Sequence, residues 1–159
     1  MPVEVSIPRN GEPAVAPRNR LVRDVMKRDF ITISREESLL EALHLMRLAR
    51  LRHLAVVSEG ALVGILSYRD LLDELLARLD RGSAPAIAQI GVVERMTAAP
   101  FSIIPDATLF EAASRLERLR VGCLPVVESG EQGLRLVGLL TEMDLVRAAY
   151  GASEARSEP

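Results

Sequence analysis

The chain has 159 residues, of which 48% are hydrophobic and 26% are charged, a composition typical of a globular protein rather than a disordered one. Its net charge of -2 gives no overall attraction for nucleic acid or anionic membranes, and its aromatic content of 3% disfavours a stacking surface for single-stranded nucleic acid. The single cysteine, Cys123, excludes an internal disulfide and a multi-thiolate metal site, and the two histidines leave little for a histidine-based one, so we expect no metal.

The N-terminal region contains no continuous apolar signal segment, and no apolar run reaches the roughly 18 residues of a membrane span. We therefore expect a cytoplasmic protein that has no membrane partner. Residues 1–20 hold four prolines and are interpreted as a flexible N-terminal arm.

A first structural unit is predicted over residues 21–80. The apolar residues 30–33 indicate a strand, and Ser38 followed by Glu41 matches a capping box that begins a helix. Two apolar runs, 54–57 and 62–66, surround a short turn and predict a β-hairpin. A second helix is expected to follow Ser67, which gives the order β-α-β-β-α.

The same order is predicted again in the second half of the chain. Residues 81–90, which include Gly82 and Pro85, are interpreted as a linker. A second unit over residues 91–150 has a predicted strand at 101–104 and a capping box that begins at Thr108. Residues 151–159 are predicted to be a polar tail.

The two units are copies of one another. A shift of 70 residues places residues 26–60 on residues 96–130, and Arg50, for example, falls on Arg120. The register then changes by four at residues 131–134, which we expect to lengthen a loop, and resumes so that Asp70 falls on Asp144. A unit of about 60 residues is marginally stable alone, so the copies are predicted to share a core.

Each copy ends its hairpin with a related polar motif: residues 64–70 read GILSYRD and residues 138–144 read GLLTEMD. The motif places a hydroxyl at the end of a strand and a carboxylate in the first turn of a helix. A helix N-terminus suits a phosphate, and an ionised Asp can accept hydrogen bonds from both hydroxyls of a ribose. Alternatively, the motif is a helix cap worth about 1 kcal/mol and nothing more. Its recurrence at the same position in both copies favours a nucleotide site.

Together with residues 24–26 (Asp-Val-Met) and 124–127 (Leu-Pro-Val-Val), these repeated motifs resemble a cystathionine β-synthase (CBS) domain pair, also called a Bateman module. The resemblance covers about residues 20–149. It implies an α+β fold of tandem β-α-β-β-α repeats, packed as a pseudo-twofold pair with two clefts between the repeats. Many members of this family bind adenine nucleotides in these clefts.

The resemblance also implies which residues line each cleft. One cleft would use Thr141, Asp144, Thr32, Leu51 and Arg52. The other would use Ser67, Asp70, Ser102, Val121 and Gly122. Family members that recognise phosphates carry basic residues at positions that here hold Arg52, His53 and Arg69 in the first repeat, but Gly122, Cys123 and Met143 in the second. Phosphate recognition is therefore expected to depend on the first repeat.

The sequence leaves several functions open. The first is a stand-alone regulatory sensor, a homodimer that binds AMP, ADP or ATP, with S-adenosylmethionine or NAD as alternatives, and signals to an unknown regulated protein. The second is a ligand-free dimerisation module that uses apolar residues of the helix after Ser67, namely Leu71, Leu72, Leu75, Leu76 and Leu79. Nucleic-acid binding through Arg47, Arg50 and Arg52 is disfavoured by the acidic charge balance, and no arrangement of residues indicates an enzyme.

Overall fold

The tandem β-α-β-β-α fold is confirmed in the computed structural model, which describes residues 19–80 and 87–150. The predicted tail, most of the predicted arm and the first part of the predicted linker lie outside these residues. The first repeat contains β1 (Thr32–Ser34), α1 (Leu39–Leu48), β2 (His53–Ser58), β3 (Ala61–Ser67) and α2 (Tyr68–Asp80). The second half contains β4 (Thr97–Ala98), α3 (Leu109–Leu119), β5 (Cys123–Gly130), β6 (Gly133–Thr141) and α4 (Glu142–Tyr150).

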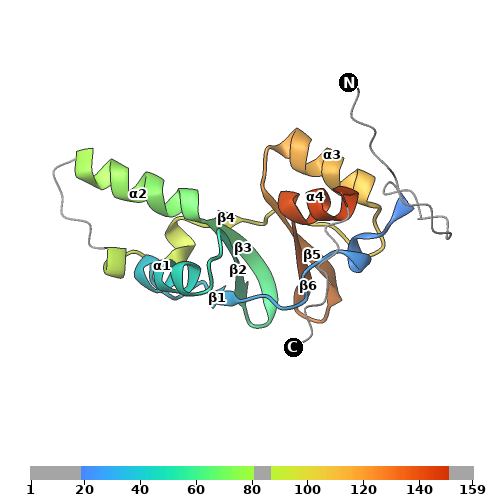
Figure 1. The fold of residues 1–159 in the computed structure, drawn as a ribbon. Helices are drawn as coiled ribbons and strands as arrows, with labels where there is room; N and C mark the ends of the chain where they lie inside the picture. Colours follow the sequence, from blue (N-terminus) through green and yellow to red (C-terminus); the bar gives the residue numbers. More distant parts are fainter. Residues whose placement is uncertain (1–18, 81–86, 151–159) are drawn as a thin grey trace, which may run out of the picture.

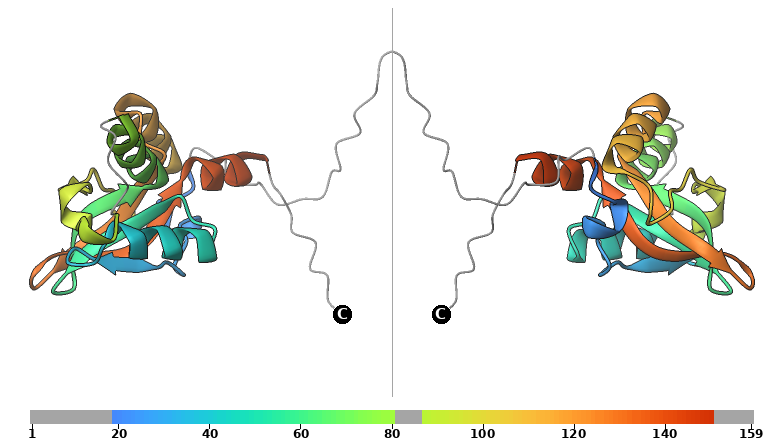
Figure 2. Two further views of the ribbon diagram at one scale, coloured as in Figure 1. Left: turned by 90° about the vertical axis from the view of Figure 1, so that its left-hand side faces the viewer. Right: turned by 90° about the vertical axis from the view of Figure 1, so that its right-hand side faces the viewer.

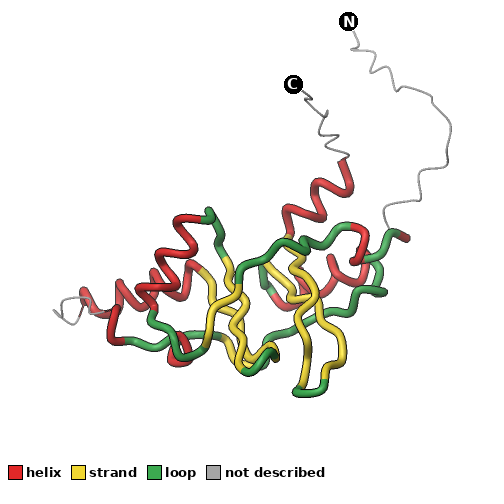
Figure 3. The backbone as a smooth tube through the Cα atoms, turned by 90° about the horizontal axis from the view of Figure 1, so that it is seen from below, coloured by secondary structure: helices red, strands yellow, loops and turns green. Residues whose placement is uncertain are grey.

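The strands occupy the middle of the molecule, with α1 and α2 on one side and α3 and α4 on the other (Figure 1). The same arrangement is seen from below in Figure 3. One sheet has the order β1-β2-β3-β4, and β5 and β6 form a second. The two hairpins contact each other through β3 and β6, and their turns point to the same side (Figure 2).

The helix starts predicted from sequence are present in both repeats. Ser38 accepts a hydrogen bond from the Glu41 N–H at 3.2 Å. Thr108 forms the complete capping box, because the Glu111 carboxylate also accepts from the Thr108 N–H at 2.8 Å. These caps satisfy N–H groups that a helix leaves unpaired and so position α1 and α3 directly after the first strand region of each repeat.

The first predicted strand of the second repeat is an exception. Residues 101–104 form one isolated parallel bridge, between Ile103 and Val126, in place of a strand. The Ile103 N–H donates to the Pro125 carbonyl at 3.0 Å, and the Val127 N–H donates to Ile103 at 2.9 Å. Pro100 and Pro105 flank the segment, and proline provides no N–H for a ladder, so pairing stops there.

The sequence analysis predicts that the four-residue insertion at residues 131–134 lengthens a loop, and this prediction is wrong. Pairing continues to Ser129 with Leu134 and to Gly130 with Gly133, so the insertion extends the hairpin. A cross-strand ion pair between Glu128 and Arg135, with 2.5 Å between the charged atoms, lies on the extended part.

The segments that precede the two repeats, residues 20–28 and 87–98, each pack on the opposite repeat, and we call them the leading segments. In the first, the Val22 N–H donates to the Ala107 carbonyl at 2.8 Å, and Lys27 pairs with Leu139. In the second, the Leu39 N–H donates to the Ile90 carbonyl at 2.9 Å, and β4 pairs with β3. Ile90, which the sequence analysis places in the linker, is buried in the core of the first repeat.

In the described parts of the chain, three aliphatic clusters form the hydrophobic cores. One belongs to each repeat with the leading segment packed on it. The third joins the two hairpins and contains Ala55, Leu62, Cys123, Val127 and Leu139. This third cluster is the shared core that the small size of each repeat predicts.

The glycine of each repeated motif is required by a close approach of a methionine. A Cβ at Gly138 would lie 2.7 Å from Met26 Sδ and 3.1 Å from the Lys27 carbonyl oxygen. A Cβ at Gly64 would meet Met96 in the same way. Met26 and Met96 lie in the leading segments, so each leading segment reaches its place only because the facing strand has no side chain at that point.

We predict that Gly138→Ala lowers the free energy of unfolding by about 1–3 kcal/mol, because the methyl group would force Met26 and the Lys27 backbone away. Chemical denaturation followed by circular dichroism measures this change. Gly91→Ala is the matched control, because a Cβ at Gly91 would have its nearest neighbour at 3.5 Å, an ordinary contact. Equal stability losses in the two variants would contradict the proposed role of the Met26 contact.

Candidate functional site

The first repeated motif forms a compact junction between β3 and α2, which we call the Asp70 junction. Asp70 Oδ2 accepts hydrogen bonds from both the N–H and the hydroxyl of Ser67, each at 2.7 Å. The Asp70 N–H donates to Ser67 Oγ at 3.2 Å. Asp70 is partly exposed, and within residues 19–80 and 87–150 its Oδ1 accepts no hydrogen bond and forms no ion pair.

The second motif forms the equivalent Asp144 junction between β6 and α4. Asp144 Oδ2 accepts from the Thr141 N–H at 2.9 Å and from the Thr141 hydroxyl at 2.6 Å. Here, however, Oδ1 lies 3.5 Å from Lys27 Nζ and 4.0 Å from Arg147 Nη1, and the Asp144 side chain is only 5% exposed. Both carboxylates therefore cap their helices through one oxygen, and the two junctions differ at the other oxygen.

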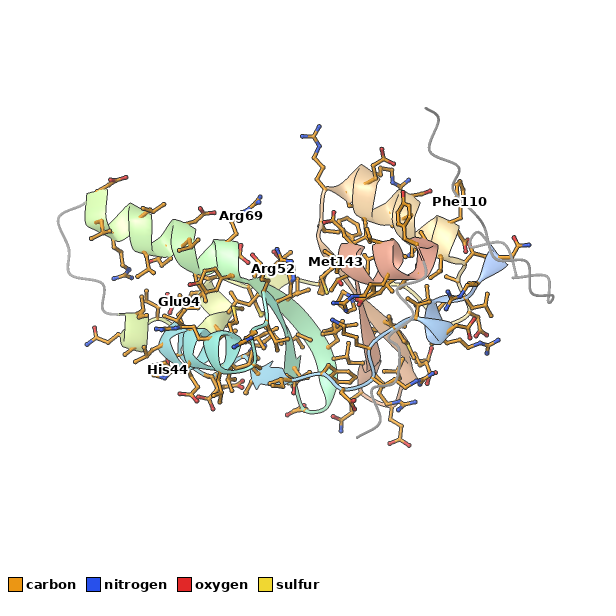
Figure 4. All side chains as sticks on the ribbon, viewed as in Figure 1. His44, Arg52, Arg69, Glu94, Phe110 and Met143 are labelled. Atoms are coloured by element: carbon orange, nitrogen blue, oxygen red, sulfur yellow. The ribbon has the colours of Figure 1, made fainter. Side chains whose placement is uncertain are left out.

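The residues before β2 and β5, Arg52 and Gly122, are hydrogen-bonded to the first residue of the helix that ends each repeat. The Arg52 carbonyl accepts a hydrogen bond from the Tyr68 N–H at 2.8 Å, and the Gly122 carbonyl accepts one from the Glu142 N–H at 3.4 Å. Arg52 is exposed near the middle of the molecule, and Arg69 is exposed on the first turn of α2 (Figure 4). Arg52 and the N-terminus of α2 are therefore close to each other.

His53 lies where the two repeats meet. A Cβ at Gly122 would lie 3.4 Å from His53 Cε1, and Glu142 Oε2 is 4.0 Å from the same point. Burial lowers the pKa of His53 below its usual value, and the Arg52 charge lowers it further, while Asp70 and Glu142 oppose this shift. The imidazole is thus held close to groups from both halves of the predicted site.

The other predicted site residues have defined positions in the fold but no described contact with the Asp70 or Asp144 carboxylate. Thr32 is half-buried in β1 opposite Ala55, and the Ser102 carbonyl accepts a hydrogen bond from Arg115. Leu51 and Val121 pack against the cores of their own repeats. Among the residues with described coordinates, no hydrogen bond or ion pair connects these four residues to Asp70 or Asp144. Their role in a cleft stays a prediction.

Lys27 and Glu142 were missed in the sequence analysis. Lys27 directly follows the Asp-Val-Met motif, and Glu142 lies inside the second repeated motif, so both are adjacent to residues that the sequence did single out. Cys123 is buried, and desolvation raises the pKa of its thiol to about 12, as expected for a small residue of the core.

The structure also has a surface hollow of about 450 Å³. It is lined by the first leading segment, residues 104–106 and the far end of β5, and none of the predicted site residues contributes to it. Of the helices in the described parts of the chain, none is both long and apolar enough to cross a bilayer, and those parts contain no cluster of potential metal ligands.

Comparison with known proteins identifies the family. The CBS domain family model matches residues 22–77 and 88–151, and this chain belongs to that family. Among solved structures, the chain is similar to a putative acetoin utilization protein (AcuB) from Vibrio cholerae, with 34% identity, a TM-score of 0.69, and coverage of 88% of this chain and 98% of that one. Some similar structures were solved with bound ligands, and two examples follow.

The first is CBSX2 in complex with AMP, with 30% identity, a TM-score of 0.65, and coverage of 81% of this chain and 95% of that one. The second is the CBS domain pair of protein MJ0100 with 5'-methylthioadenosine and S-adenosyl-L-methionine, with 26% identity, a TM-score of 0.70, and coverage of 83% and 97%.

The chain spans less than half the length of the first curated relatives that it matches. It is 28% identical to an uncharacterized 33.4 kDa protein in a ribosomal RNA operon of Thermofilum pendens, over 79% of this chain and 42% of that protein. It is 37% identical to an inosine-5'-monophosphate dehydrogenase of Korarchaeum cryptofilum, over 74% of this chain and 22% of the dehydrogenase.

We predict that the protein loses stability as the pH falls below about 6.5, because the folded state resists protonation of His53 while the unfolded state does not. The pKa of His53 is lower in the folded state than in the unfolded state. Neutral His53 therefore contributes its full share of the free energy of unfolding above the unfolded-state pKa, and this share is lost as the pH falls below that pKa. Chemical denaturation between about pH 7.5 and 5.5 should show a shallower pH dependence for His53→Gln. His44→Gln, which removes the other histidine, is the control, and an unchanged slope in His53→Gln would contradict the prediction.

Proposed function

We propose that this CBS domain pair is a regulatory module that binds an adenosine-containing ligand between its repeats and transmits the binding to a regulated protein. The observation that carries the proposal is the Asp70 junction. One carboxylate oxygen of Asp70 caps α2, and the other has no partner among the residues with described coordinates. That second oxygen can accept hydrogen bonds from the hydroxyls of a ribose.

The charges near this junction suit a phosphate. Arg52, which the family resemblance assigns to the Asp144 cleft, accepts a hydrogen bond from Tyr68 at the start of α2 and so also lies beside the Asp70 junction. Arg52 and Arg69 are exposed, and a guanidinium can bind a phosphate through two hydrogen bonds. The N-terminus of α2 adds a favourable dipole. Ser102, Val121 and Gly122 of the second repeat would line the same cleft and contact the base.

The similar proteins support an adenosine-containing ligand. CBSX2 was solved with AMP, and the MJ0100 domain pair with two adenosine derivatives. We therefore propose AMP, ADP or ATP as ligand, with S-adenosylmethionine or NAD as alternatives. The relatives that are enzymes match this chain over only a small part of their length, for example 22% of the dehydrogenase, which supports a regulatory rather than a catalytic role.

We predict that a nucleotide at about 100 times its Kd adds roughly 2.7 kcal/mol of stability and raises Tm by about 5–10 °C. Asp70→Asn keeps an oxygen for the helix cap but removes the charge that strengthens the ribose hydrogen bonds. It should weaken binding at least about tenfold in calorimetry. Asp80→Asn, an exposed change at the far end of the same helix, is the matched control. No Tm shift with any of the five ligands would refute the proposed function.

A second proposal concerns assembly, since α2 and α4 expose apolar residues to solvent. On α2, Leu72 is 44% exposed, Leu76 58% and Leu79 60%, and their spacing places them on one face of the helix. On α4, Val146 is 49% exposed and Tyr150 85%. Leu71, which the sequence analysis includes in this face, is instead buried in the first core. We propose that these faces form a homodimer, which could exist with or without ligand.

We predict that Leu72→Lys combined with Leu76→Lys halves the mass measured by light scattering, because it places charges inside the apolar interface. The control is Leu48→Lys on α1, where the side chain is 86% exposed. A monomeric wild-type protein, or a dimer that survives the double change, would contradict the proposed interface.

A further inference from the structure

Each leading segment places one residue next to a junction, and the two residues occupy equivalent positions. After Met26, the backbone of Lys27 forms two hydrogen bonds with Leu139, at 2.9 and 3.0 Å. After Met96, Thr97 in β4 pairs with Ile65 in β3. Leu139 and Ile65 both lie two residues before the hydroxyl residue of their motif, so residues 27 and 97 occupy matching positions.

The two positions differ in charge. Lys27 Nζ lies 3.5 Å from Asp144 Oδ1, and Arg147 adds a second cation at 4.0 Å. At the Asp70 junction the equivalent residues are Thr97 and Asp73, which provide no cation. Burial follows the same division, because the Asp144 side chain is 5% exposed while Asp70 is partly exposed.

A ribose can bind only a carboxylate that it can reach. At the Asp144 junction, sugar hydroxyls would have to displace the Lys27 ammonium group, whose side chain is 49% exposed, from a carboxylate that is only 5% exposed. Taking the cation away from a buried carboxylate is unfavourable. At the Asp70 junction, no comparable contact has to break.

We propose that Lys27 closes the Asp144 junction to a ribose, so that the chain binds one adenosine-containing ligand, at Asp70. This inference rests on the proposed function. It adds the number of ligand sites per chain and names Lys27 as the residue that determines that number. Lys27 acts by pairing with the Asp144 carboxylate, and the other junction stays open because Thr97 and Asp73 provide no cation there.

Calorimetric titration with AMP tests the inference. The wild-type protein should bind one AMP per chain, and Asp70→Asn should weaken that binding at least tenfold. Lys27→Thr, which copies the residue of the other leading segment, should raise the stoichiometry towards two. Lys27→Arg keeps the cation and should leave it at one. Combining Lys27→Thr with Asp70→Asn should retain one site, which Asp70→Asn alone should not.

The outcomes separate the two proposals. Two AMP molecules per wild-type chain, or a stoichiometry that stays at one in Lys27→Thr, would overturn the inference, and weaker binding in that variant would make Lys27 a phosphate ligand. In either case AMP still binds and the proposed function stands. If AMP, ADP, ATP, S-adenosylmethionine and NAD all fail to bind the wild-type protein, the proposed function is refuted and the inference falls with it. Circular dichroism melting of each variant verifies folding, and if Lys27→Thr does not fold, the Lys27→Arg and Asp70→Asn titrations still decide the number of sites.

Discussion

The close approach of a methionine to a glycine fixes the architecture of this protein. Met26 packs over Gly138 and Met96 packs over Gly64, and in both pairs the methionine belongs to a leading segment that packs on the opposite repeat. Each repeat therefore depends on a segment that precedes the other one in the chain. This exchange adds to the cluster between the hairpins and explains why two units, each too small for a stable core of its own, form one molecule.

The methionine–glycine contacts also position the residues next to the two junctions. Once the methionine is in place, the next residue of each leading segment is aligned with β6 or β3, beside a carboxylate that starts a helix. At both junctions the cap uses only Oδ2 of the carboxylate, so the cap leaves Oδ1 free at Asp70, whereas at Asp144 Oδ1 is paired with Lys27. The duplication thus provides two similar junctions, and two differences in charge, Lys27 against Thr97 and Arg147 against Asp73, make them unequal.

Most of the fold could be predicted because it is encoded locally. The caps at Ser38 and Thr108 and the apolar alternation of the hairpins depend on residues a few positions apart. The exchange of leading segments could not be predicted, since Ile90 packs on Leu39 from a distant part of the chain and no local pattern records that contact. Lys27 was missed for the same reason: its partner Asp144 is far away in sequence, so the ion pair is visible only once the segment is placed.

The central claim is that Asp70 binds the sugar of an adenosine-containing ligand, and a crystal structure of the protein grown with AMP tests it most directly. The account predicts ribose hydroxyls within hydrogen-bond distance of Asp70 Oδ1 and the Lys27–Asp144 ion pair intact. A nucleotide whose ribose lies on Asp144, with Lys27 turned away and Asp70 facing solvent, would contradict it.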